Sequence, residues 1–258
     1  MIGKNRIKSV RQLELKKFRR QTGLFVAEGP KVVGDLLEVM PAATLIGTGE
    51  WWDTHSAPAD VERIVVDDEE LRRVSFLQHP QQVMGIFSQP HVEERPEESV
   101  ARIGRQLCLA LDGVQDPGNV GTIIRIADWF GIDTIYCSAT TADAYSPKVV
   151  QSTMGSIARV RVVVTNLVAL ARLLPPEVAI YGTVLDGSDI YSQPLTGSGL
   201  LVMGNEGNGI SPELQSLLTH RLLIPHYPSH RATADSLNVA IATAIACAEF
   251  RRVAAIGR

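Results

Sequence analysis

The sequence predicts an α/β protein in which a small α/β domain precedes a larger domain built on a parallel sheet. Three observations support this prediction. From residue 107 onward, short apolar runs alternate with helical patterns, as in parallel sheets that carry helices on both faces. Before residue 90 the alternation is shorter and less regular. Between the two parts lies a charged, Pro-containing stretch without periodicity, which is typical of a linker. We therefore expect domains at residues 1–90 and 105–258, joined by a linker at 91–104.

Composition sets the broad class of the protein. The chain has 258 residues, of which 45% are hydrophobic, and this is sufficient for a packed core. No apolar run approaches the ~18 residues that span a membrane, and no early segment resembles a signal peptide. We expect a soluble, cytoplasmic protein. The cysteines lie in apolar runs without metal-ligand spacing, which predicts buried thiols and no metal site. They are Cys108, Cys137 and Cys247.

The first part begins with a basic helical segment at residues 1–20. The net charge of −3 gives no general attraction to nucleic acid, but this segment contains a single acid, Glu14, among many bases. A solvated helix face explains that pattern, and so does a surface that attracts phosphate. The bases are Lys4, Arg6, Lys8, Arg11, Lys16, Lys17, Arg19 and Arg20.

The remaining elements follow from periodicity and capping signals. Short strands are expected at residues 23–28, 43–47, 63–66 and 81–88. Helices are expected from Pro30 to about residue 39 and after Asp67, where Glu70 completes a capping-box pattern. In the second part, strands are expected at 107–111, 134–138, 159–164, 178–185, 200–203 and 221–224. Helices are expected at 119–130, 146–158, 167–174, 211–219 and 236–252.

The loop at residues 112–118 is rich in Asp, Gly and Pro and connects a buried strand to a helix. Loops of this kind, at the carboxyl ends of parallel strands, commonly carry the chemistry of α/β proteins. We predict Asn119 as the helix N-cap and Gly131 as the helix stop. Arg125 lies within the otherwise apolar helix, which is unfavourable unless an anion faces it. A side chain that extends to solvent explains Arg125 equally well.

Two further loops carry unusual residues. The loop at 203–211 contains Gly204, Gly207 and Gly209, in the wrong order for a dinucleotide fingerprint. These glycines indicate a close backbone approach to a ligand or to another backbone segment, and a plain tight turn explains them as well. The loop at 224–238 contains two histidines but too few further ligands for a metal site. Asn238, at the start of an apolar helix, needs partners for its amide and would cap backbone or order a site.

Taken together, these loops resemble the three motifs of the SpoU/TrmH family of RNA ribose 2′-O-methyltransferases. The matching stretches are Asn119-x-Gly121-x-x-x-Arg125, then residues 203–209, then Ile224-Pro225 with Ser236-Leu237-Asn238-Val239-Ala240. The resemblance covers residues 107–252. Residues 25–29 and 79–85 are similar to the family's small substrate-binding domain.

The resemblance implies a deep trefoil knot in the C-terminal domain, which is an exception to the rule that chains do not thread loops. It also implies an S-adenosyl-L-methionine site in the knot, a homodimer and a structured RNA substrate. By motif, the cofactor-binding residues are Thr183, Gly204, Ile224 and Leu237. The catalytic residue is Arg125, with Asn119, Glu206, Ser236 and Asn238 ordering the site. The segment between Ile224 and Ser236 is longer than is usual in the family.

The reaction implied is attack of a ribose 2′-hydroxyl on the sulfonium methyl group. Because a guanidinium holds its proton, we expect Arg125 to clamp the neighbouring phosphate and stabilise the alkoxide rather than act as a base. The proton acceptor would be phosphate oxygen, water or Glu206. Ribosomal RNA is the favoured substrate, with the basic residues at 4–20 as its contacts. The alternatives are transfer RNA, or a catalytically silent RNA-binding protein. A nicotinamide enzyme is disfavoured by the missing fingerprint.

Overall fold

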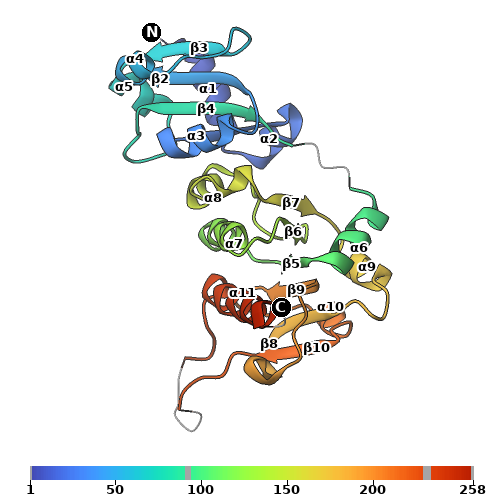
Figure 1. The fold of residues 1–258 in the computed structure, drawn as a ribbon. Helices are drawn as coiled ribbons and strands as arrows, with labels where there is room; N and C mark the ends of the chain where they lie inside the picture. The colour runs from blue at the N-terminus through green and yellow to red at the C-terminus, as the bar shows by residue number, and fades with distance from the viewer. Residues whose placement is uncertain (1, 91–93, 229–233, 257–258) are drawn as a thin grey trace. The chain divides into compact units, whose positions relative to one another are not determined.

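The computed structural model describes residues 2–90, 94–228 and 234–256. The chain divides into two compact units. The first contains residues 1–91 and 143–158, and the second contains residues 92–142 and 159–258. Each unit has its own sheet (Figure 1). The segment 143–158 belongs to the first unit by its contacts, and the boundaries expected from the sequence contain no such excursion.

The sheet of the first unit is mixed. Its strands are β1 (Leu24–Glu28), β2 (Ala42–Thr48), β3 (Glu62–Val66) and β4 (Val83–Ser88), in the order β1-β4-β2-β3. Strand β4 runs antiparallel to both neighbours, while β2 and β3 are parallel. The helices are α1 (Lys4–Gln12), α2 (Lys16–Thr22), α3 (Pro30–Leu37), α4 (Gly49–Thr54) and α5 (Asp68–Val74). Helix α5 begins with the predicted capping box of Asp67 and Glu70.

Two features of this unit differ from the sequence prediction. The basic segment forms two helices, α1 and α2, rather than one, with Leu13 buried between them. Helix α4 is an additional element of six residues that buries Trp51 and Trp52. Thr48 caps it by accepting a hydrogen bond from the Trp51 N–H. Such a short helix contains too few turns to show a helical period in the sequence.

The second unit contains a six-stranded sheet in which all strands are parallel, and this confirms the predicted fold class. Its strands are β5 (Leu107–Asp112), β6 (Thr134–Cys137), β7 (Arg161–Val164), β8 (Ile180–Asp189), β9 (Gly199–Gly204) and β10 (His220–Leu223). Their order is β10-β8-β9-β5-β6-β7. The central strands are buried on both faces, as expected when helices cover the sheet on both sides. The trefoil knot stays a prediction.

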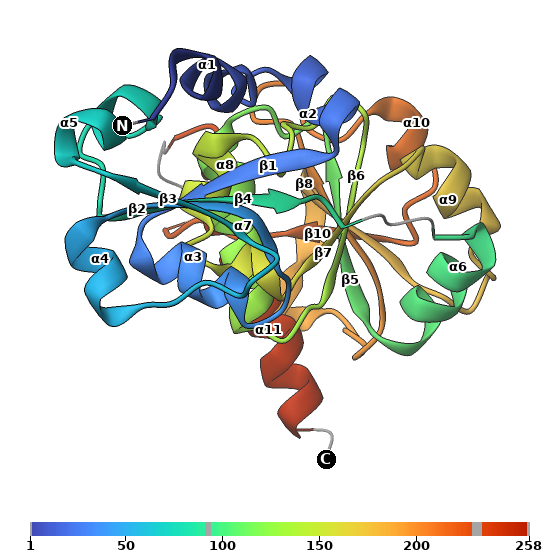
Figure 2. The same ribbon diagram turned by 90° about the horizontal axis from the view of Figure 1, so that it is seen from above.

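The helices of this unit form two layers (Figures 1 and 2). One layer contains α6 (Pro96–Arg105), α9 (Leu167–Leu173) and α10 (Pro212–Gln215), and the other contains α7 (Pro117–Trp129) and α11 (Val239–Ile256). Helix α8 (Pro147–Ser152) and the 3-10 turn η1 (Ser156–Ala158) belong to the first unit, and a second 3-10 turn, η2 (Ile190–Ser192), follows β8. The predicted helix at 146–158 is therefore broken between α8 and η1.

Helix α6 begins within the stretch predicted as a linker at 91–104 and ends one residue beyond it. Pro96 begins it, and the basic residues of its last turn suit the negative end of the helix dipole. Its fully buried residues are Ser99 and Ile103, spaced one turn apart. The charged residues around this narrow stripe hide the helical period in the sequence.

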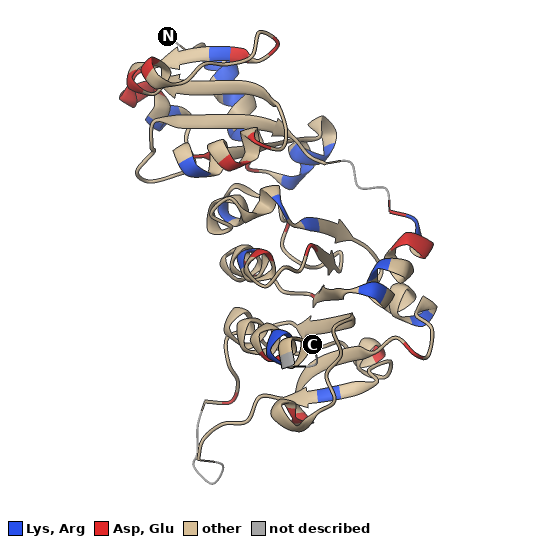
Figure 3. Cartoon of the chain, in the orientation of Figure 1, with Lys and Arg blue, Asp and Glu red and all other residues tan. Residues whose placement is uncertain are grey.

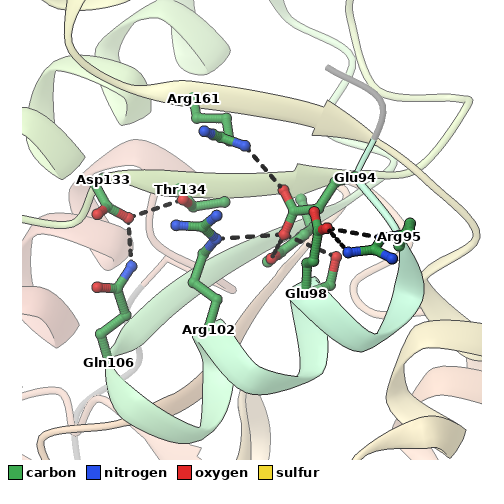
Figure 4. A network of polar contacts seen from close by, with 10 residues as sticks. Glu94, Arg95, Glu98, Arg102, Gln106, Asp133, Thr134 and Arg161 are labelled. Atoms are coloured by element: carbon green, nitrogen blue, oxygen red, sulfur yellow. Dashed lines mark hydrogen bonds and ion pairs between the residues drawn. The ribbon is translucent and has the colours of Figure 1, made fainter.

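A buried carboxylate fixes the start of α6 to the sheet (Figure 4). The Glu94 side chain is 0% exposed. It accepts hydrogen bonds from the Tyr136 hydroxyl at 2.9 Å, the Ser99 hydroxyl at 3.0 Å and Arg102 Nε at 3.3 Å. Arg161 Nη1 lies 3.5 Å from its other oxygen. Burial of a carboxylate is unfavourable unless it is paired, so this network depends on all its donors.

The three cysteines are buried and free, as predicted. Burial raises the pKa of the Cys137 thiol to about 12, so this thiol is not reactive near neutral pH. Over residues 2–90, 94–228 and 234–256, no helix has the length and hydropathy of a membrane span. The same residues contain no group of three or more His, Cys, Asp or Glu side chains that could hold a metal ion.

Candidate active site

A cavity of about 470 Å³ opens at the carboxyl ends of β8, β9 and β10. Its lining contains all the residues predicted to bind the cofactor, namely Thr183, Gly204, Ile224 and Leu237. Parallel α/β proteins bind ligands at this edge of the sheet. The size is in the range of pockets for small molecules. The cavity is therefore a candidate ligand site, and the roles of these residues stay predictions.

One wall of the cavity is the turn at residues 204–210. Asn205 and Gly209 form an isolated backbone bridge, and a Cβ atom on Gly204 would lie 2.3 Å from the Gly209 carbonyl carbon. The Asn205 side chain accepts hydrogen bonds from the Gly207 and Asn208 N–H groups at 2.9 and 3.0 Å. Gly204 is required because two backbone segments meet there. The turn therefore confirms the close approach to another backbone segment, and it also lines the cavity.

Three of the predicted site residues form a hydrogen-bond relay beside this wall. Asn238 caps α11, because its Oδ1 accepts from the N–H groups of Ala240 at 2.9 Å and Ile241 at 3.3 Å. Its amide nitrogen must then be the donor, and it donates to Asn119 Oδ1 at 2.9 Å. Asn119 Nδ2 in turn donates to Glu206 Oε1 at 2.9 Å. The capping of α11 thus fixes the direction of the whole relay.

Glu206 ends the relay as an acceptor. Besides Asn119, the N–H groups of Gln115 and Asp116 donate to its carboxylate, each at 3.3 Å. Burial opposes ionisation of this carboxyl, but these hydrogen bonds outweigh burial and lower the pKa of Glu206. A carboxylate with a lowered pKa and three donors is a weak proton acceptor. Its position makes Glu206 a bridge between the 204–210 turn and the start of α7.

The N-cap of α7 was predicted at the wrong residue. The helix begins at Pro117, and Asp116 is the N-cap, since its carboxylate accepts from the Asn119 N–H at 2.9 Å. Asp followed by Pro is a strong start signal, because Pro is favoured at the first helical position. Asn119 is therefore at the third helical position, which leaves its side chain free to join the relay. Helix α7 ends at Trp129, and Gly131 has the left-handed conformation (φ 62°) expected of a helix stop.

Arg125 and Ser236 lie outside the relay. Arg125 is exposed on α7, and its guanidinium has no polar partner in the described part of the chain. Ser236 is exposed and lines the cavity. The structure therefore brings Asn119, Glu206 and Asn238 together, places Ser236 at the cavity, and leaves Arg125 available to an anion. The alternative interpretation, a side chain that extends to solvent, also accounts for the exposure of Arg125.

Lys and Arg residues lie along α1 and α2 (Figure 3), and their contacts separate them into two groups. Arg19 is only 2% exposed, with an ion pair to Asp143 at 2.6 Å and hydrogen bonds to the Leu13 and Glu14 carbonyls. Its predicted contact with RNA is wrong, because the guanidinium is committed inside the first unit. Arg6 pairs with Glu62, and Arg11 bonds the Ser75 carbonyl and lies over the Phe76 ring. The exposed bases that keep the prediction open are Lys4, Lys8, Lys16, Lys17 and Arg20.

Some site residues were not predicted from the sequence. Asp112 accepts from the Ser211 N–H at 2.7 Å and so connects the end of β5 to the start of α10. Asp186, Gln215 and Asp235 line the cavity. An acid at the end of a parallel strand is a signal that sequence reading could have used for Asp112. The others required the strand register.

The all-parallel sheet and the loop cavity define an α/β protein with a candidate small-ligand site at the carboxyl edge of its sheet. Comparison with known proteins gives the family. The chain belongs to the SpoU rRNA methylase family, whose profile matches residues 106–248. An MRM3-like substrate-binding domain matches residues 4–85.

Individual relatives cover nearly the whole chain. The 23S rRNA (guanosine(2553)-2′-O)-methyltransferase RlmP of Bacillus subtilis is 33% identical over 246 residues, which are 93% of each protein. A TrmH-family structure from Porphyromonas gingivalis has 41% identity and a TM-score of 0.87, and covers 98% of this chain and 99% of that one. The AdoMet-bound rRNA methyltransferase of Sinorhizobium meliloti has 31% identity and a TM-score of 0.81, and covers 96% of this chain and 94% of that one.

Proposed function

We propose that this protein transfers a methyl group from S-adenosyl-L-methionine to a ribose 2′-hydroxyl in ribosomal RNA. The observation that carries the proposal is the cavity at the carboxyl edge of the parallel sheet, whose lining includes the four residues that match the family's cofactor motif. Membership of the SpoU rRNA methylase family and the AdoMet-bound relative from Sinorhizobium meliloti support it.

The cavity suits a cationic cofactor. Its lining contains the carboxylates of Glu206 and Asp235, and that of Asp186, whose charge is already paired with Arg221, and no Lys or Arg from the described residues. Leu222, Leu223 and Val239 supply apolar surface for the rest of the ligand. When bound, S-adenosyl-L-methionine would supply an activated methyl group on a positively charged sulfur. Thr183, Gly204, Ile224 and Leu237 would hold it.

The residues around the cavity have distinct tasks in this proposal. Arg125 clamps an RNA phosphate and stabilises the negative charge that develops on the attacking oxygen, since its fork of N–H donors has no other partner among the described residues. The relay from Asn238 to Glu206 holds the 204–210 turn against α7. The proton acceptor in this proposal is phosphate oxygen, water or Glu206, and the hydrogen bonds that lower the pKa of Glu206 make its carboxylate a weak base.

The proposed substrate rests on the relatives, and its proposed contacts lie on the first unit. Relatives named as rRNA methyltransferases favour ribosomal RNA over transfer RNA. Exposed lysines on α1 and α2 would contact phosphates, and binding would then weaken steeply with salt. A cytoplasmic location is part of the proposal. If total transfer RNA is methylated instead, the substrate assignment is wrong while the activity stands.

We also propose a homodimer that uses the outer face of α7 and α11. The two helices run side by side, with Asn238 bonded to Asn119 at one end and Arg251 bonded to the Phe130 carbonyl at the other. Trp129 is 85% exposed on α7 and Ile241 is 52% exposed on α11. A dimer interface on this face would remove the apolar surface of both side chains from water. Trp129→Glu should convert a dimer to a monomer in light scattering, and a wild-type monomer would refute the proposal.

The test of the activity is transfer of labelled methyl from S-adenosyl-L-methionine to bacterial RNA that is fractionated afterwards. The expected result is label in one ribosomal RNA species, at a nucleotide that resists alkaline cleavage, and none with Arg125→Ala. Assembly intermediates serve as substrate if naked RNA is not labelled. Cofactor binding without label in any RNA would favour the silent RNA-binding alternative.

A further inference from the structure

The regular pairing of strand β8 with β10 is interrupted beside the cavity. Gly182 pairs with Arg221 and Ser188 pairs with Leu222, so residues 183–187 are looped out between two consecutive residues of β10. We call residues 183–187 the β8 bulge. Four of its residues, 183–186, line the cavity. The bulge therefore forms one wall of the cavity without the ladder hydrogen bonds that hold a regular strand.

The base of the bulge is closed tightly against β10. A Cβ atom on Gly187 would lie 2.7 Å from the Leu222 carbonyl carbon and 2.8 Å from the Arg221 carbonyl group, so only glycine fits there. One residue earlier, Asp186 Oδ1 accepts from Arg221 Nη2 at 2.5 Å. This ion pair joins the bulge to the strand that it has left.

Arg221 also contacts Gln215, which is bonded to the 204–210 turn. Its Nη1 lies 3.5 Å from Gln215 Oε1, and Gln215 Nε2 donates to the Ile210 carbonyl at 2.8 Å. Ile210 belongs to the 204–210 turn, which also lines the cavity. The contacts Asp186–Arg221–Gln215–Ile210 therefore connect the two walls of one cavity.

We propose that Asp186, Arg221 and Gln215 are positioning residues that set the width of the cavity and, through it, the affinity for the cofactor; this inference rests on the function proposed above. The Asp186 side chain is 75% exposed, and exposed ion pairs contribute little to folding. The same pair can contribute to binding, because a wall that is already in place need not be ordered when the ligand enters. None of the three residues has a role in the reaction proposed above, so we expect the effect on binding rather than on chemistry.

The test uses direct calorimetry of S-adenosyl-L-methionine binding and steady-state kinetics with RNA. For Arg221→Gln and Asp186→Asn we expect a roughly two- to five-fold rise in Kd and in the cofactor KM, with kcat unchanged at saturation. Arg221→Lys should recover part of the affinity, because a point charge restores the pair with Asp186 but not the fork that also reaches Gln215. High salt should bring the wild-type Kd toward that of the variants.

Two controls separate positioning from other effects. Arg73→Gln breaks an exposed ion pair of the same 2.5 Å length, with Glu69 in the first unit, and should leave the Kd unchanged. S-adenosylhomocysteine lacks the sulfonium charge, and its Kd should rise by the same factor as that of the cofactor. A rise for the cofactor alone would mean that Asp186 acts as a counter-charge, and would overturn the inference.

The failures of the two proposals are distinguishable. A wild-type protein that does not bind S-adenosyl-L-methionine would refute the proposed function. A wild-type protein that binds it, with variants that bind equally well or that lose kcat instead, would refute only the positioning role.

Discussion

Asn238→Asp should disrupt the relay while keeping the helix cap. An aspartate still accepts from the Ala240 and Ile241 N–H groups, and its charge suits the start of a helix. It cannot donate to Asn119, so two oxygens face each other across 2.9 Å. If the Asn119 amide turns over, the conflict moves to Glu206 Oε1, which is also 2.9 Å away. Either arrangement leaves one acceptor facing another.

The expected cost follows from one lost hydrogen bond and one unpaired acceptor. Such a loss costs about 1–3 kcal/mol when buried, and these side chains are partly exposed, so about 1–1.5 kcal/mol is reasonable. If cofactor binding requires an intact relay, the same free energy is lost from binding, and cofactor affinity falls roughly five- to ten-fold. Calorimetric titration with S-adenosyl-L-methionine measures it. Asn208→Asp, which adds the same charge beside the same cavity but outside the relay, is the control and should change affinity by less.

A double variant provides the strict test. When Asn238→Asp is combined with Glu206→Gln, the relay can run in reverse. The new amide at position 206 donates to a turned Asn119, which donates to the new carboxylate at position 238. Only the exposed Asp116 N–H is then left to water. We expect the double variant to bind the cofactor more tightly than the sum of the two single effects predicts, by about 1 kcal/mol of coupling. Strictly additive effects would refute the assigned direction of the relay.

Three further predictions concern separate parts of the chain. Arg125→Ala should abolish methyl transfer with cofactor Kd unchanged, and Arg125→Lys should stay well below wild type because a point charge does not replace the fork; full activity in either would remove the assignment. Burial raises the pKa of Glu28, so the folded state binds its proton more tightly and stability should fall as pH rises from about 4.5 through the folded pKa. In Glu28→Gln this loss should be absent, as urea midpoints at pH 5 and 7 would show, and an identical pH dependence in both proteins would contradict it. Glu94→Ala leaves the Tyr136 hydroxyl without its acceptor, while the partly exposed Arg102 and Arg161 guanidiniums can turn to water, so it should cost about 1–3 kcal/mol in urea unfolding, whereas a cost near zero would mean that the network is not coupled.

The sheet of the second unit was predictable because its strands are short apolar runs bounded by turns. The residues at its carboxyl edge were predictable for a related reason, since parallel strands bring their carboxyl ends together whatever the strand order. Thr183, Gly204 and Leu237 lie far apart in sequence yet line one cavity. Their roles are inferred from the motif resemblance, and the structure shows only that they line the same cavity.

Other features depend on three-dimensional contacts that no local pattern encodes. Arg19 resembles its basic neighbours in the sequence, and only the fold reveals Asp143 beside it. The β8 bulge arises from the pairing of β8 with β10, so Asp186 could not be assigned to the cavity in advance. The N-cap at Asp116 is a different case, because Asp116-Pro117 is a local start signal in the sequence, whereas the prediction placed the cap at Asn119.

The most direct test of the central claim is mass spectrometry of nucleosides from ribosomal RNA, or its assembly intermediates, incubated with this protein and S-adenosyl-L-methionine that carries a trideuterated methyl group. The account predicts the deuterated methyl in a single ribose-methylated nucleoside, and its absence with Arg125→Ala. Deuterated methyl on a base would contradict the proposed chemistry. Cofactor bound but no label in any RNA would contradict the assignment as an enzyme.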